Sequence, residues 1–450
     1  MRAIKINEII QELGATLYGN EDAFFDSVII DSRLSKESAL FIGIKGENFD
    51  GSQMYQDAFS RGASVAIVEN IDVKEIPQGK AVLKVSSTYR AILDLAYYYR
   101  RSLPVKIIGI TGSTGKTSTK DILHGMLKES FKVFKTAGNY NNELGLPLMI
   151  FSLDDSYDYA ILEMGMSAPL EIHNLARVAQ PDYAIITNIG VSHIENLGSR
   201  ENILKAKMEI TDFFHKDSLL ILNGDDKYLD TIENKTYKIL RGGLQKGDFV
   251  AKNMLTLENS IGFTVNQKKT KISIDIPGKH NISNAILCYI VAMELGVKKD
   301  KLEKIHVEKS AMRMEIIEGK AVKIINDCYN ANPDSMKAAL TYLKTFEGRK
   351  VALLGTMKEL GNEAMKSHIA VAEFAKEKAI DIVVFVGEYE KEMRETFGEN
   401  SFSYKDVEEA MKHMDLWLKP QDTVLLKASR GMAFEQFLPQ LKEFGGVNHD

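Results

Sequence analysis

The sequence predicts an α/β protein of three domains with mostly parallel sheets. At 450 residues the chain is too long for one ordinary hydrophobic core. Short apolar runs alternate almost throughout with amphipathic helical stretches, which is the pattern of α/β layers around parallel strands. The hydrophobic fraction of 44% and the charged fraction of 26% are typical of a soluble globular protein.

Composition excludes several classes of partner. The 57 Lys and Arg residues against 62 Asp and Glu residues give a formal net charge of -5, and no basic stripe stands out, so nucleic acid is not expected as a partner. Two distant cysteines, Cys288 and Cys328, do not make a disulfide framework, which indicates a reducing cytoplasm. No apolar run reaches the roughly 20 residues of a membrane span. Ile6, Ile9 and Leu13 recur at helical spacing and predict an amphipathic helix at the amino terminus rather than an export signal.

The first predicted domain covers residues 1–103. Apolar runs predict strands over residues 28–30, 39–44, 65–68 and 81–85. A helix over residues 52–61 is expected to end at Gly62, which suits a left-handed cap. A longer helix over residues 88–101 leads to Pro104, where we place the boundary.

The second domain, residues 104–310, and the third, residues 311–450, show the same alternation. In the second domain, strands are expected over residues 105–110, 159–162, 183–187 and 219–222, followed by a strand-rich stretch over 252–276 and a helix beginning near Asn281. In the third, strands over residues 322–325, 351–354, 382–386 and 423–427 alternate with helices, one of them over 335–346. The third domain therefore reads as a separate doubly wound, Rossmann-like unit.

A phosphate-binding loop is predicted at the start of the second domain, between an apolar strand and a helix. The run is Gly109, Ile110, Thr111, Gly112, Ser113, Thr114, Gly115, Lys116, Thr117 and Ser118. Backbone N–H groups at a helix start bind anions. Lys116 is expected to reach the terminal phosphates of ATP, and the Thr117 hydroxyl to bind Mg²⁺. The strict motif fails by one place, because Ile110 stands where the first glycine is expected, and a plain glycine turn is the alternative.

Metal-ligand candidates follow two of the predicted strands, since ligands of a parallel sheet gather at the carboxyl ends of its strands. Glu163 follows the strand over residues 159–162, and His193 lies shortly beyond the strand over 183–187. Further on, a predicted helix carries Lys205 and Lys207, and composition gives no reason to choose between them. Taken alone, each of these residues is more often structural than functional.

Several of these runs together resemble one family. The runs over residues 111–118, 188–210 and 278–285 resemble the Mur ligases of peptidoglycan synthesis. Those over residues 138–147, 163–165, 327–333 and 429–432 are most similar to the branch that adds D-alanyl-D-alanine to UDP-N-acetylmuramoyl-tripeptide. The resemblance extends over essentially the whole chain.

The resemblance implies a function for each domain and for single residues. It implies a UDP-substrate-binding first domain, an ATP-binding second domain and a third domain that completes the ligase site. It implies an ADP-forming ligase, monomeric and cytoplasmic, that uses ATP and Mg²⁺ and passes through an acyl phosphate. Catalysis and metal binding are implied for Lys116, Thr117, Glu163, His193 and Lys207, the last as a carbamate. ATP contacts are implied for residues 111–118 and for Asn281, Asn284, Arg313, Asp327 and Asn330. Substrate contacts are implied for Ser32, Arg33, Asn139, Asn141, Asn142, Ser429 and Arg430, and the runs over 31–33 and 46–51 resemble the uridine-nucleotide end of the site.

Departures from the family pattern leave the peptide contacts open. Ser52 stands where a His is expected, Thr356 replaces an Asp, and Ala428 replaces a Gly. The alternatives are a Mur-type ligase that adds a single amino acid, a folylpolyglutamate-synthase-like ligase, a phosphotransferase, and a non-catalytic regulator that binds UDP-sugar or nucleotide. The first hundred residues argue against the folylpolyglutamate type, and five intact catalytic candidates argue against the regulator.

Overall fold

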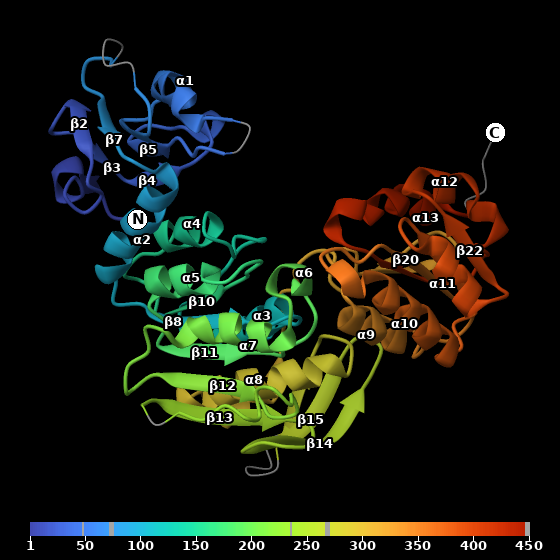
Figure 1. Ribbon diagram of the computed structural model, residues 1–450. Coiled ribbons are helices and arrows are strands. Elements are labelled where there is room, and N and C mark those ends of the chain that lie inside the picture. The colour runs from blue at the N-terminus through green and yellow to red at the C-terminus, as the bar shows by residue number, and fades with distance from the viewer. Residues whose placement is uncertain (47–48, 72–75, 235, 266–270, 446–450) are drawn as a thin grey trace.

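Three large sheets follow one another along the chain and confirm the α/β fold class (Figure 1). The computed structural model describes residues 1–46, 49–71, 76–234, 236–265 and 271–445. We call the parts built on the three sheets the N-terminal unit (residues 4–101), the central unit (106–305) and the C-terminal unit (315–443). No helix among the described residues is long and apolar enough to cross a membrane.

The N-terminal unit holds a five-stranded sheet in the order β2-β7-β6-β5-β4. Its strands are β2 (Thr16–Gly19), β4 (Ser27–Ile29), β5 (Ala39–Ile42), β6 (Val65–Val68) and β7 (Ala81–Lys84), and only β2 pairs antiparallel. A separate antiparallel pair joins β1 (Ile4–Lys5) to β3 (Phe24–Phe25). The helix predicted over residues 52–61 is a 3₁₀ turn, Gly51–Met54, followed by α1 (Tyr55–Ser60).

The amphipathic helix predicted at the amino terminus is wrong in type. Ile6–Glu8 forms a single 3₁₀ turn, and hydrogen-bonded turns continue as far as Gly14. Ile6 and Ile9 are nevertheless fully buried, as the spacing of apolar residues requires. The pattern therefore identified the buried side chains but overestimated the length of regular helix, which ends at Ile9, where the backbone has a φ of -117°.

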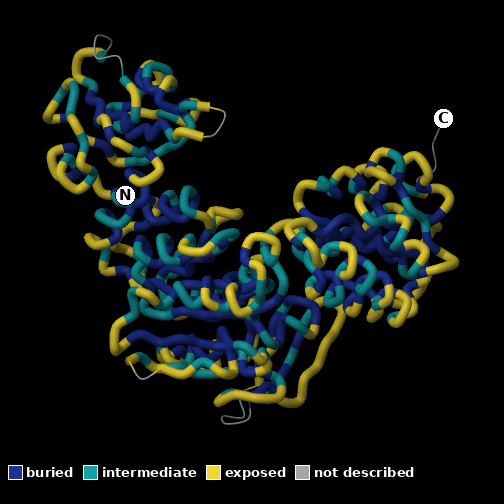
Figure 2. Tube along the Cα trace, viewed as in Figure 1, coloured by how far each residue is buried: buried dark blue, intermediate teal, exposed yellow. Residues whose placement is uncertain are grey.

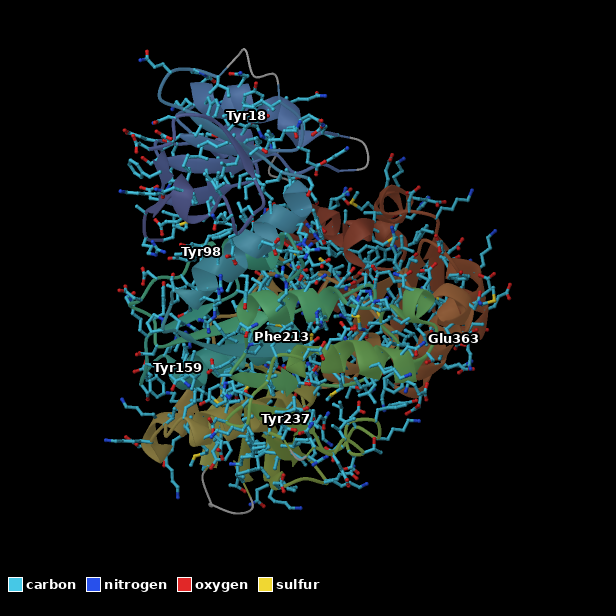
Figure 3. All side chains as sticks on the ribbon, turned by 60° about the vertical axis from the view of Figure 1, so that its left-hand side comes forward. Tyr18, Tyr98, Tyr159, Phe213, Tyr237 and Glu363 are labelled. Carbon is cyan, nitrogen blue, oxygen red and sulfur yellow. The ribbon has the colours of Figure 1, made fainter. Side chains whose placement is uncertain are left out.

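Helix α2 (Thr88–Arg101), which matches its predicted bounds, joins the N-terminal unit to the central unit. Ser87 caps its start by accepting a hydrogen bond from the backbone of Arg90. Near its end, the Tyr99 hydroxyl donates to the carbonyl of Leu153 at 2.7 Å, and Nε of Arg100 donates to the carbonyl of Ala179 at 2.8 Å. Tyr98, labelled on this helix in Figure 3, lies where the two units meet. These buried contacts fix α2 against the central unit.

The central unit is built on a ten-stranded sheet that is parallel over its larger part. The parallel strands are β9 (Val133–Lys135), β10 (Tyr159–Glu163), β8 (Lys106–Thr111), β11 (Tyr183–Ile186), β12 (Leu219–Asn223), β13 (Lys238–Gly243) and β14 (Phe249–Thr256), in that order. β15 (Ile261–Val265) and β16 (Lys271–Ile274) continue antiparallel, and β17 (Lys304–Ile305) closes the edge. The helices are α3 (Lys116–Leu127), α4 (Gly145–Phe151), α5 (Glu171–Ala179), α6 (Ile194–Leu197), α7 (Arg200–Met208) and α8 (His280–Glu294).

The C-terminal unit is a six-stranded sheet in the order β18-β19-β23-β20-β21-β22. β18 (Glu315–Glu318) is the antiparallel edge, and β19 (Lys323–Asn326), β23 (Thr423–Lys427), β20 (Lys350–Gly355), β21 (Ile382–Val386) and β22 (Ser401–Tyr404) are parallel. The helices are α9 (Pro333–Leu343), α10 (Ala364–Glu377), α11 (Glu390–Phe397), α12 (Val407–Lys412) and α13 (Leu438–Glu443).

Buried residues follow the three sheets, and an exposed arm bridges two of the units (Figure 2). The arm is the turn between β14 and β15, which reaches from the central unit to the C-terminal unit. There the carboxylate of Glu258 lies 2.8 Å from Nζ of Lys323, and its carbonyl accepts from the hydroxyl of Tyr342. The arm and the linker that precedes β18 are thus two separate connections to the C-terminal unit.

Candidate active site

The predicted phosphate loop connects β8 to α3, and two of its glycines are sterically required. Gly112 has a φ of 148°, and a Cβ there would lie 1.8 Å from Oγ1 of Thr187. Gly115 has a φ of 80°, and a Cβ there would lie 2.8 Å from Oδ1 of Asn284. The loop is therefore packed closely against β11 on one side and α8 on the other, and only glycine fits at both positions.

Asn188, which sequence reasoning passed over as a site residue, holds this loop in shape. Its side-chain oxygen accepts from the backbone N–H of Thr114 at 2.9 Å, and its carbonyl accepts from that of Ser113 at 3.1 Å. It directly follows the buried β11 strand and so lies at the same sheet edge as the loop. That position, a polar residue at a strand end, is the signal that could have identified it.

Glu163 ends β10 beside the phosphate loop and is almost fully buried. One carboxylate oxygen accepts from the hydroxyl of Thr117 at 3.0 Å, and the other accepts from the side-chain amide of Asn141 at 3.0 Å. Two predicted metal ligands and one predicted substrate residue therefore meet at a single point. Oxygen donors in this arrangement are of the kind that Mg²⁺ prefers.

Two lysines, Lys116 and Lys207, lie near each other beside the contact between Thr117 and Glu163. Nζ of Lys116 folds back onto the loop and donates to the carbonyl of Gly112 at 2.9 Å. Burial lowers the pKa of Lys116, with the charge of Glu163 opposing that effect. Lys207 on α7 is buried, and its pKa is lowered well below the ordinary value by burial and then by the charge of Lys116. Lys205, two residues earlier on the same helix, is exposed, so the structure separates the two candidates.

A cavity of about 250 Å³ opens between the phosphate loop, α8 and the C-terminal unit. Asn281 and Asn284 line it and are buried, and the amide of Asn284 donates to Oδ1 of Asn281 at 3.1 Å. Nη2 of Arg313 lies 3.4 Å from Oγ1 of Thr117, and the guanidinium stacks 4.2 Å from the centre of the Tyr329 ring. Nε of Arg313 is buried without a hydrogen-bond partner among the described residues. An unpaired buried donor beside a phosphate loop fits an anionic ligand.

Asp327 also lines this cavity, but its carboxylate is engaged within the protein. Nζ of Lys427 lies 2.6 Å from one carboxylate oxygen, and the backbone N–H of Met314 donates to the other at 3.2 Å. Lys427 was not among the predicted residues, although it ends a parallel strand. His280 lies nearby, and desolvation lowers the pKa of its imidazole to about 4.

A second pocket of about 420 Å³ lies on the other side of Arg313, between the central and C-terminal units. Its lining includes Lys116, Asn139, Asn141, Asn142, Glu163, His193, Arg313, Asn330, Ser429 and Arg430 from the predicted set. Arg430 is paired with Glu435 at 2.6 Å, whereas the ammonium of Lys358, also in the lining, has no recorded hydrogen bond or ion pair with the described residues. The pocket thus holds carboxylate, amide and cationic groups from two units.

The two units meet across this pocket through polar contacts. Nδ1 of His193 lies 2.7 Å from Oε2 of Glu359, and the amide of Asn332 donates to the hydroxyl of Ser192 at 2.8 Å. No group of three or more His, Cys, Asp or Glu side chains suited to a metal ion occurs in the described ranges. His193 lies in the same pocket lining as Glu163 but is not part of such a cluster.

Some of the predicted site residues lie outside both pockets or make structural hydrogen bonds. Ser32 and Arg33 belong to the N-terminal unit and line neither pocket, and Arg33 is exposed and paired with Asp31 at 2.7 Å. The side chain of Asn142 accepts from the backbone of Gly145 at the start of α4. Within the run over 46–51, residues 47 and 48 lie outside the described residues.

The arrangement can bind a polyphosphate, hold a divalent cation beside it and bring a second reactant from the facing unit. A phosphate loop with a lysine supplies the anion site. A buried carboxylate and hydroxyl supply oxygen ligands. The pocket that both units line supplies a place where two further substrates can meet, as a group-transfer reaction requires.

Three family models match consecutive parts of the chain. Residues 25–99 match the Mur ligase family catalytic domain, residues 110–292 the Mur ligase middle domain, and residues 312–430 the Mur ligase glutamate ligase domain. The matched ranges contain the phosphate loop, Glu163, Asn281 and Arg313, on which the geometry above depends.

Curated relatives and solved structures agree over nearly the full length. The chain is 36% identical over 443 residues to UDP-N-acetylmuramoyl-tripeptide–D-alanyl-D-alanine ligase of Bacillus subtilis (strain 168), covering 94% of each chain. It is 29% identical over 462 residues to the ligase of the same name from Escherichia coli (strain K12), covering 99% of this chain and 100% of that one. Among solved structures, a crystal structure of MurF from Acinetobacter baumannii superimposes with a TM-score of 0.90 at 28% identity, covering 98% and 99% of the two chains. MurF ligase of Thermotoga maritima in complex with ADP gives a TM-score of 0.82 at 29% identity, covering 93% and 97%.

Proposed function

Because the chain belongs to the Mur ligase family, we propose that its two-unit pocket joins D-alanyl-D-alanine to UDP-N-acetylmuramoyl-tripeptide. The reaction consumes ATP and yields ADP, phosphate and UDP-N-acetylmuramoyl-pentapeptide, a step of peptidoglycan synthesis. The observation that carries the proposal is the meeting of Lys116, Thr117, Glu163 and Asn141 at the mouth of a pocket lined by both the central and the C-terminal unit.

The chemistry begins with activation of a carboxylate, which is a poor electrophile. The terminal carboxylate of the tripeptide attacks the γ-phosphate of ATP, forming an acyl phosphate and releasing ADP. The amine of D-alanyl-D-alanine then attacks the acyl carbon, and phosphate leaves. In this scheme Lys116 stabilises negative charge on the transferring phosphoryl group, and Arg313 reaches the same phosphates through Nε, which has no partner among the described residues.

Mg²⁺ fits the donors beside the phosphate loop. Thr117 and Glu163 present two oxygens 3.0 Å apart, and Asn141 orients the carboxylate from its other oxygen. Proteins commonly hold Mg²⁺ with one or two carboxylates together with phosphate oxygens and water. When bound, the ion supplies positive charge that neutralises the phosphate and carboxylate oxygens as they approach each other.

Lys207 is proposed to act as a carbamate. A buried ammonium beside the charge of Lys116 is unfavourable, and burial and that charge lower the pKa of Lys207 and so favour the neutral amine, the form that adds CO₂. The product is a carboxylate, which reverses the sign of the charge next to Lys116. With His193 it would complete a second divalent-cation position near the attacking carboxylate of the substrate.

The remaining parts have roles consistent with this chemistry. We propose that residues 1–103 bind the uridine-nucleotide end of the substrate through Ser32 and Arg33, that residues 104–310 bind ATP, and that residues 311–450 supply Asn330, Ser429 and Arg430 to the dipeptide site. We further propose that the enzyme works in the cytoplasm as a monomer, with Cys288 and Cys328 as the free, buried thiols they are in the structure.

The decisive test is release of ADP and phosphate with UDP-N-acetylmuramoyl-tripeptide and ATP, with and without D-alanyl-D-alanine. Tripeptides ending in lysine and in diaminopimelate are both tried. Dipeptide-dependent release with a product of pentapeptide mass is expected. Release that requires a free amino acid instead would assign the chain to a sister ligase, and no turnover with any substrate would favour a binding protein.

A matched pair of variants ties the activity to the pocket. Lys116→Met is expected to lower kcat by at least about 100-fold, in line with the loss of one donor to a developing oxyanion. Lys128→Met at the far end of α3 removes the same charge, but Lys128 pairs with Glu308 and neither residue lines either pocket, so activity should be unchanged. Equal effects of the two substitutions would contradict the assignment of Lys116.

A further inference from the structure

The loop that follows β20 carries Glu359 from the C-terminal unit to His193 of the central unit. Oε2 of Glu359 lies 2.7 Å from Nδ1 of His193. Nδ1 is buried, and it has no aligned hydrogen-bond partner among the described residues, so the carboxylate of Glu359 is the group that lies against it.

The backbone on both sides of this contact is held in an uncommon conformation. His193 has a φ of 62° and Glu359 a φ of 66°, a region that residues with a side chain rarely adopt without support from their surroundings. That support is visible: a Cβ on Gly361 would lie 3.1 Å from Cβ of Glu195, so the loop after Glu359 packs directly on α6. The amide of Asn332 reaches Ser192, next to His193, from the same unit. Three segments, around His193, Asn332 and Glu359, therefore converge to place one carboxylate against one imidazole.

This pairing has a specific chemical consequence for the imidazole. A histidine that binds a metal through one ring nitrogen usually donates its other N–H to a carboxylate, which fixes the tautomer and the ring orientation. Here Nδ1 faces Glu359, which leaves Nε2 as the nitrogen available to a ligand. His193 lines the same pocket as Lys116 and Glu163, where the phosphates and the cation are proposed to lie.

We propose that Glu359 is a positioning residue that orients His193 for Mg²⁺, so that this metal position is complete only when the C-terminal unit is docked. The inference rests on the proposed function for its assignment of His193 as a ligand. Glu359 lies outside the predicted set of site residues and belongs to a different unit from His193. The proposal therefore makes metal binding and docking of the two units depend on each other. By linkage, the ion that favours the docked arrangement is itself bound more tightly in it.

The test uses the full-length protein with Mn²⁺ in place of Mg²⁺, a non-hydrolysable ATP analogue and the UDP-linked tripeptide. Electron paramagnetic resonance measures the affinity for Mn²⁺, and electron spin echo modulation detects an imidazole nitrogen bound to it. In Glu359→Gln we expect the dissociation constant of the histidine-containing position to rise by about 10-fold or more, the range found when such partners of metal-binding histidines are removed. The nitrogen modulation should weaken in parallel, and Glu359→Asp should restore part of both signals.

Glu363→Gln is the matched control. Glu363 lies four residues further on, is labelled at the edge of the C-terminal unit in Figure 3, and pairs only loosely with Lys366 at 3.8 Å. It loses the same charge from the same part of the chain, so wild-type affinity and modulation are expected. Retained Trp417 fluorescence in all variants shows that the C-terminal unit is folded.

Three outcomes would overturn the inference. Unchanged affinity and modulation in Glu359→Gln would show that His193 needs no partner. Tighter binding in that variant would show that Glu359 competes with the metal instead of assisting it. Absence of imidazole modulation in the wild type would remove His193 as a ligand. Dipeptide-dependent ADP release by the same wild-type preparation, measured alongside, separates each of these from a failure of the proposed function.

Discussion

Replacing Lys427 by methionine is expected to destabilise the C-terminal unit by about 3–5 kcal/mol, the cost of leaving a buried charge unpaired. Nζ of Lys427 lies 2.6 Å from Oδ2 of Asp327 and 3.1 Å from the carbonyl of Asn330. The lysine side chain is 2% exposed and the aspartate side chain 10%, so both charges are largely withdrawn from solvent. Methionine fills most of the lysine volume, and the loss therefore reports on charge more than on packing.

Urea unfolding followed by tryptophan fluorescence measures this loss in the unit concerned. The chain has one tryptophan, Trp417, which is fully buried in the core of the C-terminal unit. Lys412→Met is the control: it makes the same change in the same unit, but Lys412 pairs with Glu408 at an exposed helix surface, so no measurable shift is expected.

The double variant Asp327→Asn with Lys427→Met separates pairing from other effects. If the two side chains stabilise each other, the double variant loses less than the sum of the single losses, by about 1–3 kcal/mol. Strictly additive losses in the free energy of unfolding would refute the reasoning. So would a loss below about 1 kcal/mol for Lys427→Met, because leaving a buried carboxylate unpaired costs more than that.

Three further predictions concern the site. Lys207→Ala should lose most activity in the ADP-release assay, and a small carboxylic acid should restore part of it; unchanged activity, or no rescue, would refute the carbamate. Thr117→Val keeps the shape of the side chain but removes the hydroxyl 3.0 Å from Glu163, so kcat should fall on the order of 100-fold. Thr117→Ser retains the hydroxyl and should keep most activity. Similar kcat values for the two variants would contradict a role for the hydroxyl. In the folded protein the pKa of His280 is about 4, below its ordinary value of 6.5, so its contribution to stability is present above pH 6.5 and is lost as the pH falls from 6.5 toward 4. Urea unfolding across this range should show a decline in the free energy of unfolding on the order of 1–3 kcal/mol that is absent in His280→Asn. Identical pH profiles for the wild type and the variant would contradict this prediction.

The rule for parallel sheets predicted several residues that the structure brings together. Glu163 follows a buried strand, and the structure places it against Thr117 of the phosphate loop. Asn188 follows the neighbouring strand of the same sheet and was missed, although the same rule applies to it. Helix α2 was predicted with its exact bounds, since Ser87 supplies a cap and apolar residues recur along one face. The prediction of an amino-terminal helix was wrong because the spacing of apolar residues does not reveal where the backbone departs from helical geometry, here at Ile9.

Residues that act across units could not be predicted in the same way. The side chains of Lys205 and Lys207 leave α7 on different faces, and which face is buried depends on how that helix packs. Glu359 lies far from His193 in sequence, and nothing local relates the two. Glu359 lies just beyond the end of β20, so the strand-end rule could mark it as a candidate but could not identify His193 as its partner.

The way the units meet explains how such a site can both close and release its product. Contacts between the central and C-terminal units are mainly polar: Glu258 with Lys323, Ser192 with Asn332, and His193 with Glu359. Partly exposed contacts of this kind are each worth about 1 kcal/mol or less, so the docked arrangement is held weakly by the protein alone. On the proposed function, ATP, the cation and the peptide substrates would bridge the same two surfaces and so favour the docked state. Once ADP, phosphate and the peptide product dissociate, those bridges are gone, and the polar contacts that remain are too weak to prevent opening.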